Sequence, residues 1–274
     1  MNLTVNGKQY TTKATTIAQL AAELQLPTDV TIVNGFQTAE NLALTEGDSV
    51  TLIQKGVMPS PDELESMMCA RHTPQVHEKV KAAKVAIAGL GGLGSNIAIL
   101  LARTGVGTLF LVDFDIVEPS NLNRQSYFIT HLGMAKTEAL KEQITQINPF
   151  ITVKTRQIKV TEENAPELFA NYPIICEAFD NPQSKAILVN TLLTQSAGTK
   201  LICGSGMAGY GSCNTIQTKQ ALQGLYPFRL PEYRGTKIPA DSVLTFCTLI
   251  FTVRQPPVFS CGSPTGIRSQ TAHP

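Results

Sequence analysis

Charged and carboxamide side chains gather in one short stretch of the chain, directly after a predicted strand. Asp113 and Asp115 open the stretch, and a further carboxylate, several amides and two fixed cations follow them. These later members are Glu118, Asn121, Asn123, Arg124, Gln125 and Lys136. Hydride transfer needs little charge beyond what binds a pyrophosphate, whereas nucleotidyl transfer must neutralise phosphate oxygens and usually needs a metal ion. The stretch therefore favours phosphate chemistry.

The elements that position these side chains begin with a glycine turn. The apolar run from Val85 to Ala88 indicates a strand that ends at Gly89, and the apolar spacing of a helix starts just past Gly94. Such a turn lets the backbone approach a phosphate and points free N–H groups and the positive end of a helix dipole at it. The glycine spacing alone is a weak signal, because a helix packed tightly on a sheet also requires such glycines.

A second predicted strand, residues 108 to 112, ends at Asp113. Asp113 lies 24 residues beyond Gly89, close to the spacing at which a carboxylate that binds ribose hydroxyls is expected. NAD and ATP satisfy this pattern equally well. The charged stretch that follows separates them in favour of ATP.

A later strand, residues 173 to 176, delivers Asp180 at its carboxyl end, which is where doubly wound folds bind their ligands. Magnesium prefers carboxylate and phosphate oxygens, so Asp180 is the candidate ligand for Mg²⁺. The alternative interpretation is a helix N-cap, because Asn181 and Pro182 begin the next predicted helix.

Four sequence phrases are specific in combination. They are AGLGGLGSN (88 to 96), VDFDIVEPSNLNRQ (112 to 125), GMAK (133 to 136) and EAFDN (177 to 181). The chain resembles the adenylating enzymes of the ubiquitin-activating superfamily, and within it the ThiF family, over roughly residues 1 to 218. The resemblance implies a doubly wound, Rossmann-like α/β domain that uses ATP and Mg²⁺. The implied reaction adenylates the C-terminal glycine carboxylate of the ubiquitin-like sulfur carrier ThiS, in thiamine biosynthesis, and releases pyrophosphate.

The resemblance also implies a role for each matching residue. Gly89, Gly91 and Gly94 would cradle the nucleotide, Asp113 would bind the ribose, and Asp115 would help through a neighbouring group. Asn121 and Gln125 would orient the phosphates, Arg124 and Lys136 would neutralise them, and Asp180 would hold Mg²⁺. Arg71 matches a family arginine that binds the triphosphate, often across a dimer interface, and the alternative for it is a plain surface charge. Pro74 stands where the family usually has a second arginine.

Residues 1 to 57 form a separate predicted unit. Two strands joined at Asn6-Gly7, a helix that ends before Pro27 and two further strands predict a small β-grasp, ubiquitin-like domain, and the unit resembles ThiS. A working carrier ends in a free Gly-Gly, whereas here Lys55 and Gly56 run on into Val57. We expect a fused module that is not adenylated and that shapes or regulates docking. The alternative is that cleavage after Gly56 releases a carrier.

The rest of the chain divides into an adenylating domain, residues 58 to 218, and an atypical segment, residues 219 to 274. The segment contains seven of the sixteen prolines. Apart from a candidate strand at residues 243 to 253, its composition predicts irregular structure. The family normally continues with a glycine-rich loop and a helix, so the segment indicates a truncated, frame-shifted or divergent end.

Composition excludes several classes of protein. A chain of 274 residues that is 43% hydrophobic is long enough for one large α/β domain plus a small module, and a net charge of +1 gives no reason to expect nucleic acid or membranes. The six cysteines include no Cys-x-x-Cys pair, so no zinc site is apparent, and no covalent role can be assigned to Cys203 or Cys213. Without a signal peptide or a membrane-spanning run, a cytoplasmic protein is expected. The family implies a homodimer.

Three other functions stay open. An adenylyltransferase for another acceptor would act on a molybdopterin carrier or a modified tRNA base, and the neutral charge and the ThiS-like module argue against tRNA. A non-catalytic scaffold would keep the fold and the carrier-docking face without turnover. An NAD oxidoreductase is disfavoured because no proton-relay pair stands out.

Overall fold

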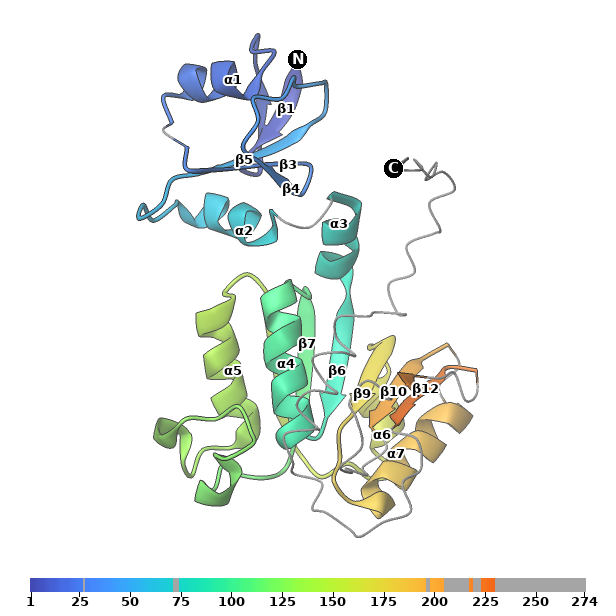
Figure 1. Ribbon diagram of the computed structural model, residues 1–274. Coiled ribbons are helices and arrows are strands. Elements are labelled where there is room, and N and C mark those ends of the chain that lie inside the picture. The colour runs from blue at the N-terminus through green and yellow to red at the C-terminus, as the bar shows by residue number, and fades with distance from the viewer. Residues whose placement is uncertain (27, 71–73, 196–197, 205–216, 219–222, 230–274) are drawn as a thin grey trace, which may run out of the picture. The chain divides into compact units, whose positions relative to one another are not determined.

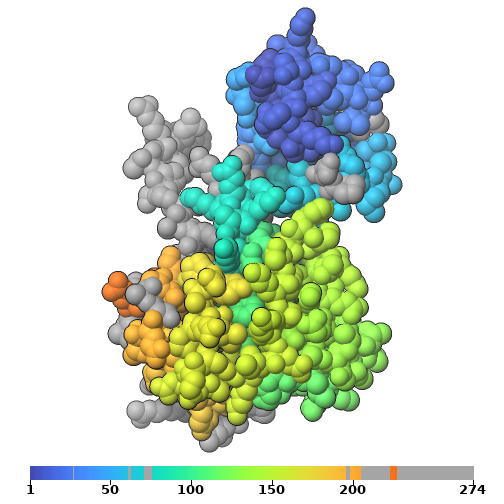
Figure 2. All heavy atoms as spheres, turned by 180° about the vertical axis from the view of Figure 1, so that it is seen from behind, coloured from blue at the N-terminus to red at the C-terminus, as the bar shows by residue number. Residues whose placement is uncertain are grey.

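The computed structural model (Figure 1) describes residues 1–274 except 27, 71–73, 196–197, 205–216, 219–222 and 230–274. The chain divides into two compact units, Met1–Ala82 and the part from Ala83 onward, and Figure 2 shows each as a closely packed mass of atoms. This division places residues 58 to 82 in the first unit. The predicted domain boundary after residue 57 stays a prediction.

The first unit is a β-grasp fold. Its elements are β1 (Asn2–Val5), β2 (Lys8–Thr11), α1 (Ile17–Leu24), β3 (Val30–Val33), β4 (Phe36–Thr38), β5 (Ser49–Ile53), α2 (Pro61–Cys69) and α3 (Pro74–Ala82). The sheet has the order β2-β1-β5-β3-β4, in which β1 and β5 run parallel and the other pairs antiparallel. The predicted small β-grasp domain is confirmed, with the short strand β4 in addition.

Local chemistry explains why this unit folds as it does. Asn6 and Gly7 both have positive φ, as a two-residue hairpin between twisted strands requires. Thr16 caps α1 by accepting a hydrogen bond from the Gln19 N–H. The apolar face of α1, with Leu20 fully buried, then closes the core over the sheet.

The second unit contains the larger sheet. Its elements are β6 (Lys84–Ala88), α4 (Gly92–Thr104), β7 (Thr108–Asp113), η1 (Pro119–Asn121), η2 (Ile129–His131), α5 (Lys136–Ile147), β8 (Thr152–Gln157), α6 (Ala165–Phe169), β9 (Ile174–Glu177), α7 (Pro182–Gln195), β10 (Lys200–Gly204), β11 (Gln217–Thr218) and β12 (Leu225–Arg229). The order of the described strands is β11-β12-β10-β9-β6-β7-β8, and every neighbouring pair except β11 and β12 is parallel.

Helices cover both faces of this sheet. Ala86 and Ala88 of β6 pack in one core with Phe169 of α6 and Leu188 of α7, whereas a Cβ built on Gly94 of α4 would lie 3.2 Å from the Ile87 side chain. Since successive strand residues point to opposite faces, α4 covers the face opposite α6 and α7. The predicted doubly wound α/β fold is confirmed.

The order of the strands reverses next to β6. From β6 the chain proceeds through β7 to β8 on one side, and then returns to build β9, β10 and β12 on the other side (Figure 1). The carboxyl ends of β6, β7 and β9 therefore meet at a topological switch point, which is where open α/β sheets bind ligands.

Two strands of the second unit, β11 and β12, were not predicted. The strand β12 lies in the proline-containing segment for which the sequence predicted irregular structure outside residues 243 to 253, and it pairs in parallel with β10. The candidate strand at 243 to 253 lies outside the described residues. Within the part of the chain that the structure describes, no helix is long and apolar enough to cross a membrane.

Candidate functional site

The glycine turn between β6 and α4 is shaped by close backbone contacts. A Cβ added at Gly94 would stand 1.8 Å from the carbonyl oxygen of Gly89, so this position requires glycine for packing. Gly89 has φ +91°, and a Cβ there would lie 2.9 Å from the Ala178 carbonyl oxygen. At Gly91 the nearest atom to an added Cβ is Gln125 Nε2, at 3.9 Å. Two glycines therefore serve packing, while the third borders space that no described atom fills within 3.9 Å.

Asp113 ties this turn to the end of β7. Its buried carboxylate accepts a hydrogen bond from the Leu90 N–H at 2.6 Å and one from the Asp115 N–H at 2.9 Å. The Gly89 N–H donates to the Val112 carbonyl at 2.9 Å, which continues the ladder between β6 and β7. The carboxylate that the sequence assigned to the ribose thus also holds the backbone of the glycine turn.

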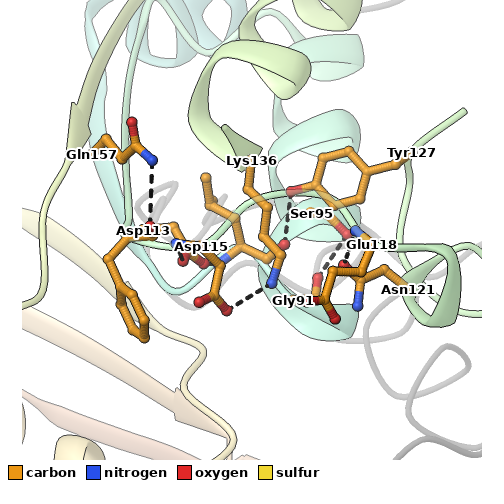
Figure 3. Close-up of polar contacts among 11 residues, drawn as sticks. Gly91, Ser95, Asp113, Asp115, Glu118, Asn121, Tyr127, Lys136 and Gln157 are labelled. Carbon is orange, nitrogen blue, oxygen red and sulfur yellow. Dashed lines mark hydrogen bonds and ion pairs between the residues drawn. The ribbon is translucent and has the colours of Figure 1, made fainter. Parts of the chain in front are cut away.

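Lys136 places a positive charge beside the carboxylate of Asp115. Its side chain is only 7% exposed, and Nζ lies 3.0 Å from Asp115 Oδ2 (Figure 3). The backbone repeats the link, because the Lys136 N–H donates to the Asp115 carbonyl at 3.0 Å. The partner carboxylate is 47% exposed, so this ion pair extends from the interior to the surface of the site.

Tyr127 and Ser95 brace the other side of the turn, as Figure 3 shows. The Tyr127 hydroxyl donates to the Leu90 carbonyl at 2.8 Å, and the Ser95 hydroxyl donates to the Gly91 carbonyl at 2.7 Å. Burial raises the pKa of Tyr127, and the charges of Asp113 and Asp115 raise it further. The phenol therefore stays protonated and donates its hydrogen bond at neutral pH.

The loop after β7 carries the predicted phosphate-binding amides and arginine. Asn121 is buried and its Oδ1 accepts from the Glu118 N–H at 2.9 Å, which shapes η1 (Figure 3). Arg124 donates from Nη1 to the Ser120 carbonyl at 2.9 Å and to Asn123 Oδ1 at 3.1 Å. Both residues hold the loop in this structure.

Gln125 borders the open space over Gly91. Its side chain is 8% exposed, and its Oε1 has no hydrogen-bond partner among the residues that the structure describes. A buried acceptor without a partner costs about 1 to 3 kcal/mol, so Oε1 calls for a donor other than the described residues. The first N–H groups of α4 lack partners within the helix and carry its positive dipole end at the same place. The amide nitrogen of Gln125 and these N–H groups are donors, which is what the phosphate oxygens of a nucleotide require.

The carboxyl end of β9 forms the remaining side of the site. Glu177 is fully buried and contacts the ammonium of Lys185 on α7, while its Oε1 accepts from the Phe179 N–H at 2.8 Å. The Phe179 ring lies 3.0 Å from the position of a Cβ on Gly89. Asp180, the next residue, is exposed.

A metal ion at Asp180 would need ligands other than the described side chains. Among the described residues, no group of three or more His, Cys, Asp or Glu side chains could hold a metal. This arrangement fits Mg²⁺, which commonly binds through one or two carboxylates, water and substrate phosphates.

Cysteines near the site are not reactive thiols. Cys176 is buried in β9, and burial raises its pKa to about 12. Burial also raises the pKa of Cys203 in β10, with a contribution from the neighbouring Glu177. Since the thiolate is the nucleophile, neither side chain is suited to covalent catalysis. Cys213 lies outside the described residues.

The structure brings most of the predicted residues to one edge of the sheet. Gly89, Gly91 and Gly94 form the turn, and around it lie Asp113, Asp115, Asn121, Arg124, Gln125, Lys136 and Asp180. Arg71 lies outside the described residues. Sequence reasoning missed Tyr127, Ser95 and Lys185, because their roles depend on backbone carbonyls that only the fold brings within reach.

Two family models match the chain. The ThiF family model matches residues 65–255, and a model described as ThiS-like ubiquitin matches residues 1–56. The first match extends beyond residue 218, where the sequence resemblance was expected to end.

Curated relatives are similar over the central part of the chain. The adenylyltransferase and sulfurtransferase UBA4 of Eremothecium gossypii is 34% identical over 134 residues, which is 48% of this chain and 30% of the relative. The adenylyltransferase and sulfurtransferase MOCS3 of Dictyostelium discoideum is 35% identical over 163 residues, 58% of this chain and 38% of the relative. The probable adenylyltransferase/sulfurtransferase MoeZ of Mycobacterium tuberculosis is 38% identical over 105 residues, 38% of this chain and 27% of the relative. The matched part thus spans about a third of the length of these relatives.

Solved structures share the fold. The E. coli tRNA N6-threonylcarbamoyladenosine dehydratase TcdA in complex with AMP superposes with a TM-score of 0.58 at 23% identity, over 72% of this chain and 96% of that one. The same enzyme in complex with ATP has a TM-score of 0.58 at 22% identity, over the same shares.

Proposed function

Because this chain belongs to the ThiF family, we propose that it uses ATP to adenylate the C-terminal glycine carboxylate of a ubiquitin-like sulfur carrier. The observation that carries the proposal is the open space over Gly91. It lies at the N-terminus of α4, beside the Nε2 donor of Gln125 and near the turn that Asp113 holds. A helix N-terminus with free N–H groups favours an anion such as a phosphate.

This reaction requires no covalent intermediate with a side chain of the protein. A carboxylate oxygen of the carrier attacks the α-phosphorus of ATP, a new O–P bond forms, and the bond to the bridging oxygen breaks so that pyrophosphate leaves. The carboxylate is already ionised at neutral pH, so no general base is required. Catalysis then consists of positioning and of neutralising the phosphate charge.

Each group at the sheet edge has a place in this scheme. Lys136 and Arg124 offset phosphate charge, and Asp115 holds the Lys136 ammonium at the required position. Asp113 binds the ribose hydroxyls, and Asn121 and Gln125 orient the phosphates. Arg71, in the part of the chain before Ala83, would add a further cation.

Magnesium would be held by Asp180. When bound with the nucleotide, it would act as a Lewis acid that offsets the charge on the phosphate oxygens. The exposed Asp180 carboxylate, three residues beyond the end of β9, supports this assignment.

The carrier that we propose as substrate is a separate ThiS-like protein that acts in thiamine thiazole biosynthesis. The ThiS-like match of residues 1–56 supports this choice, because it links the chain to that class of carrier. The fused module itself lacks a free carboxylate. Its end is also held in place, since the Lys55 N–H donates to Asp29 Oδ2 at 2.8 Å and Gly56 has φ +76° before the chain continues into Val57.

The test is ATP–pyrophosphate exchange with Mg²⁺, measured with and without a separate carrier that ends in Gly-Gly. We expect exchange only when the carrier is added, because the fused module has no carboxylate to activate. Exchange without added carrier would contradict the fused module's role as a non-substrate.

The same assay separates the competing functions. Exchange with a molybdopterin carrier and not with a ThiS-like one would change the acceptor and keep the chemistry. ATP binding without exchange for any carrier or tRNA would favour a non-catalytic scaffold. Preference for NAD over ATP in a binding assay would refute the adenylation proposal.

A further inference from the structure

Lys185 joins three elements at the site through one ammonium group. It lies in the first turn of α7, and its Nζ contacts the carboxylate of Glu177 at the end of β9. The same Nζ donates to the carbonyl of Gly204, the last residue of β10, at 2.8 Å. Because β9 and β10 are parallel neighbours, Lys185 links the carboxyl ends of two adjacent strands to the helix that connects them.

The partner of Lys185 controls the backbone that leads to Asp180. One oxygen of Glu177 faces the ammonium, and the other accepts from the Phe179 N–H at 2.8 Å. The Ala178 N–H donates to the Ala88 carbonyl at 2.8 Å, and the Ala178 carbonyl packs where Gly89 lacks a Cβ. The turn from 177 to 180 is therefore held between Lys185 on one side and the glycine turn on the other.

Burial makes this arrangement depend on the ion pair. The Glu177 side chain is fully buried and the Lys185 side chain is 21% exposed. A buried carboxylate that loses its cation is left with an uncompensated charge, whereas replacing both partners together is often neutral. The ion pair between Glu177 and Lys185 therefore adds little to the free energy of unfolding. It does fix the position of the Glu177 carboxylate and of the turn from 177 to 180.

We propose that Lys185 is a positioning residue that sets the turn from 177 to 180 and so presents the Asp180 carboxylate to nucleotide-bound Mg²⁺. This role rests on the proposed function. Lys185 contacts neither nucleotide nor metal in this scheme, and it acts through Glu177 and the Phe179 amide.

The experiment compares Lys185→Met with the conservative Lys185→Arg and with Lys141→Met. Lys141 is the matched control, because it is 46% exposed on α5 and its Nζ lies 4.0 Å from Glu138 Oε2. Hydrogen exchange of peptides that contain the Phe179 amide reports the turn without any ligand. We expect faster exchange there in Lys185→Met, wild-type exchange in Lys141→Met, and recovery toward wild type in Lys185→Arg.

Calorimetric titration of ATP at a series of MgCl₂ concentrations measures how the affinity for ATP depends on Mg²⁺. We expect Lys185→Met to require at least about tenfold more Mg²⁺ for the same ATP affinity, as is usual when a group that orients a metal ligand is lost. Asp180→Ala should show a similar requirement. Adding Lys185→Met to Asp180→Ala should cause no further change, since both act on one carboxylate. If Lys185→Met unfolds the chain, the neutral pair Glu177→Gln with Lys185→Met replaces it in both measurements.

The outcomes distinguish a failure of the proposed function from a failure of the positioning role of Lys185. A wild-type protein whose ATP binding ignores Mg²⁺ would overturn the proposed function and the role of Lys185 with it. A wild type that responds to Mg²⁺ together with a Lys185→Met variant that responds equally would overturn the role of Lys185 alone. A further loss in the double variant would also overturn it, because Lys185 would then act independently of Asp180.

Discussion

At Lys136 a positive charge lies inside the protein, with Nζ 3.0 Å from Asp115 Oδ2 and only 7% of the side chain exposed. A charge at a buried position is screened less by water and salt than one on the surface, so it interacts more strongly with a phosphate brought beside it. Asp115 keeps this ammonium compensated before the substrate binds. Burial and the pairing with Asp115 therefore explain why Lys136 differs from the exposed Lys141 of the same helix.

Replacing Lys136 by alanine tests this difference. We expect Lys136→Ala to lower the rate of carrier-dependent pyrophosphate exchange by about 10²- to 10³-fold, by analogy with the loss of one group that stabilises developing charge. Lys141→Ala, on the exposed face of the same helix, should leave the rate within about twofold, since isolated surface ion pairs contribute little. Equal losses in the two variants would contradict a role of Lys136 in the reaction.

At the scale of elements, the glycine turn combines two different requirements. Gly89 and Gly94 allow β6, α4 and the Ala178 backbone to approach one another, whereas Gly91 borders the space beside Gln125. The three glycines look equivalent in the sequence. Only the packing of the elements around them separates the two structural positions from the one that borders the proposed phosphate space.

Alanine substitutions at two of these glycines should separate stability from binding. Gly94→Ala places a Cβ 1.8 Å from the Gly89 carbonyl oxygen, so we expect a loss of about 3 kcal/mol or more in the free energy of unfolding. Gly91→Ala meets no described atom closer than 3.9 Å, and we expect a change within about 1 kcal/mol.

For ATP affinity we expect Gly91→Ala to matter, although it changes stability little. We expect Gly91→Ala to weaken ATP affinity in calorimetry while the protein stays folded, because its methyl group enters the proposed phosphate space. Unchanged ATP affinity in Gly91→Ala would refute the placement of the phosphates over this glycine. Denaturant unfolding of both variants provides the stability comparison.

At the scale of the whole molecule, the chain contains two units with separate cores. The core of the β-grasp unit includes Leu3, Leu20 and Val50, and the core of the second unit includes Phe110 and Leu188. The two clusters share no residue. A substitution in one core should therefore lower the stability of that unit and leave the stability of the other unit unchanged.

Leu20→Ala tests this independence. Leu20 is fully buried, so we expect a loss of about 2 to 5 kcal/mol in the stability of the first unit. Calorimetric unfolding should show one transition that moves to lower temperature and a second that stays in place. ATP affinity should be unchanged, and a loss of ATP affinity in a folded Leu20→Ala variant would contradict the assignment of the described site residues to the second unit.

Much of this architecture could be predicted from the sequence, because it depends on local patterns. The alternation of apolar residues, the Asn6-Gly7 turn and the Gly89 to Gly94 spacing each lie within a short stretch of sequence, so they can be recognised without the fold. The same holds for Asp113, Asp115 and Lys136, whose residue types and order favoured phosphate chemistry. The strand β12 was missed, since its proline obscured the pattern and only the pairing with β10 makes it a strand.

Tertiary structure decided which side chains act on one another. Lys185 resembles any helix lysine until β9 and β10 lie side by side and bring Glu177 and the Gly204 carbonyl to its ammonium. Gln125 becomes notable only because its Oε1 is buried without a described partner next to Gly91. Sequence determines residue type and local conformation, whereas burial and the approach of distant segments arise only when the sheet assembles. Those two quantities set the electrostatics of the site.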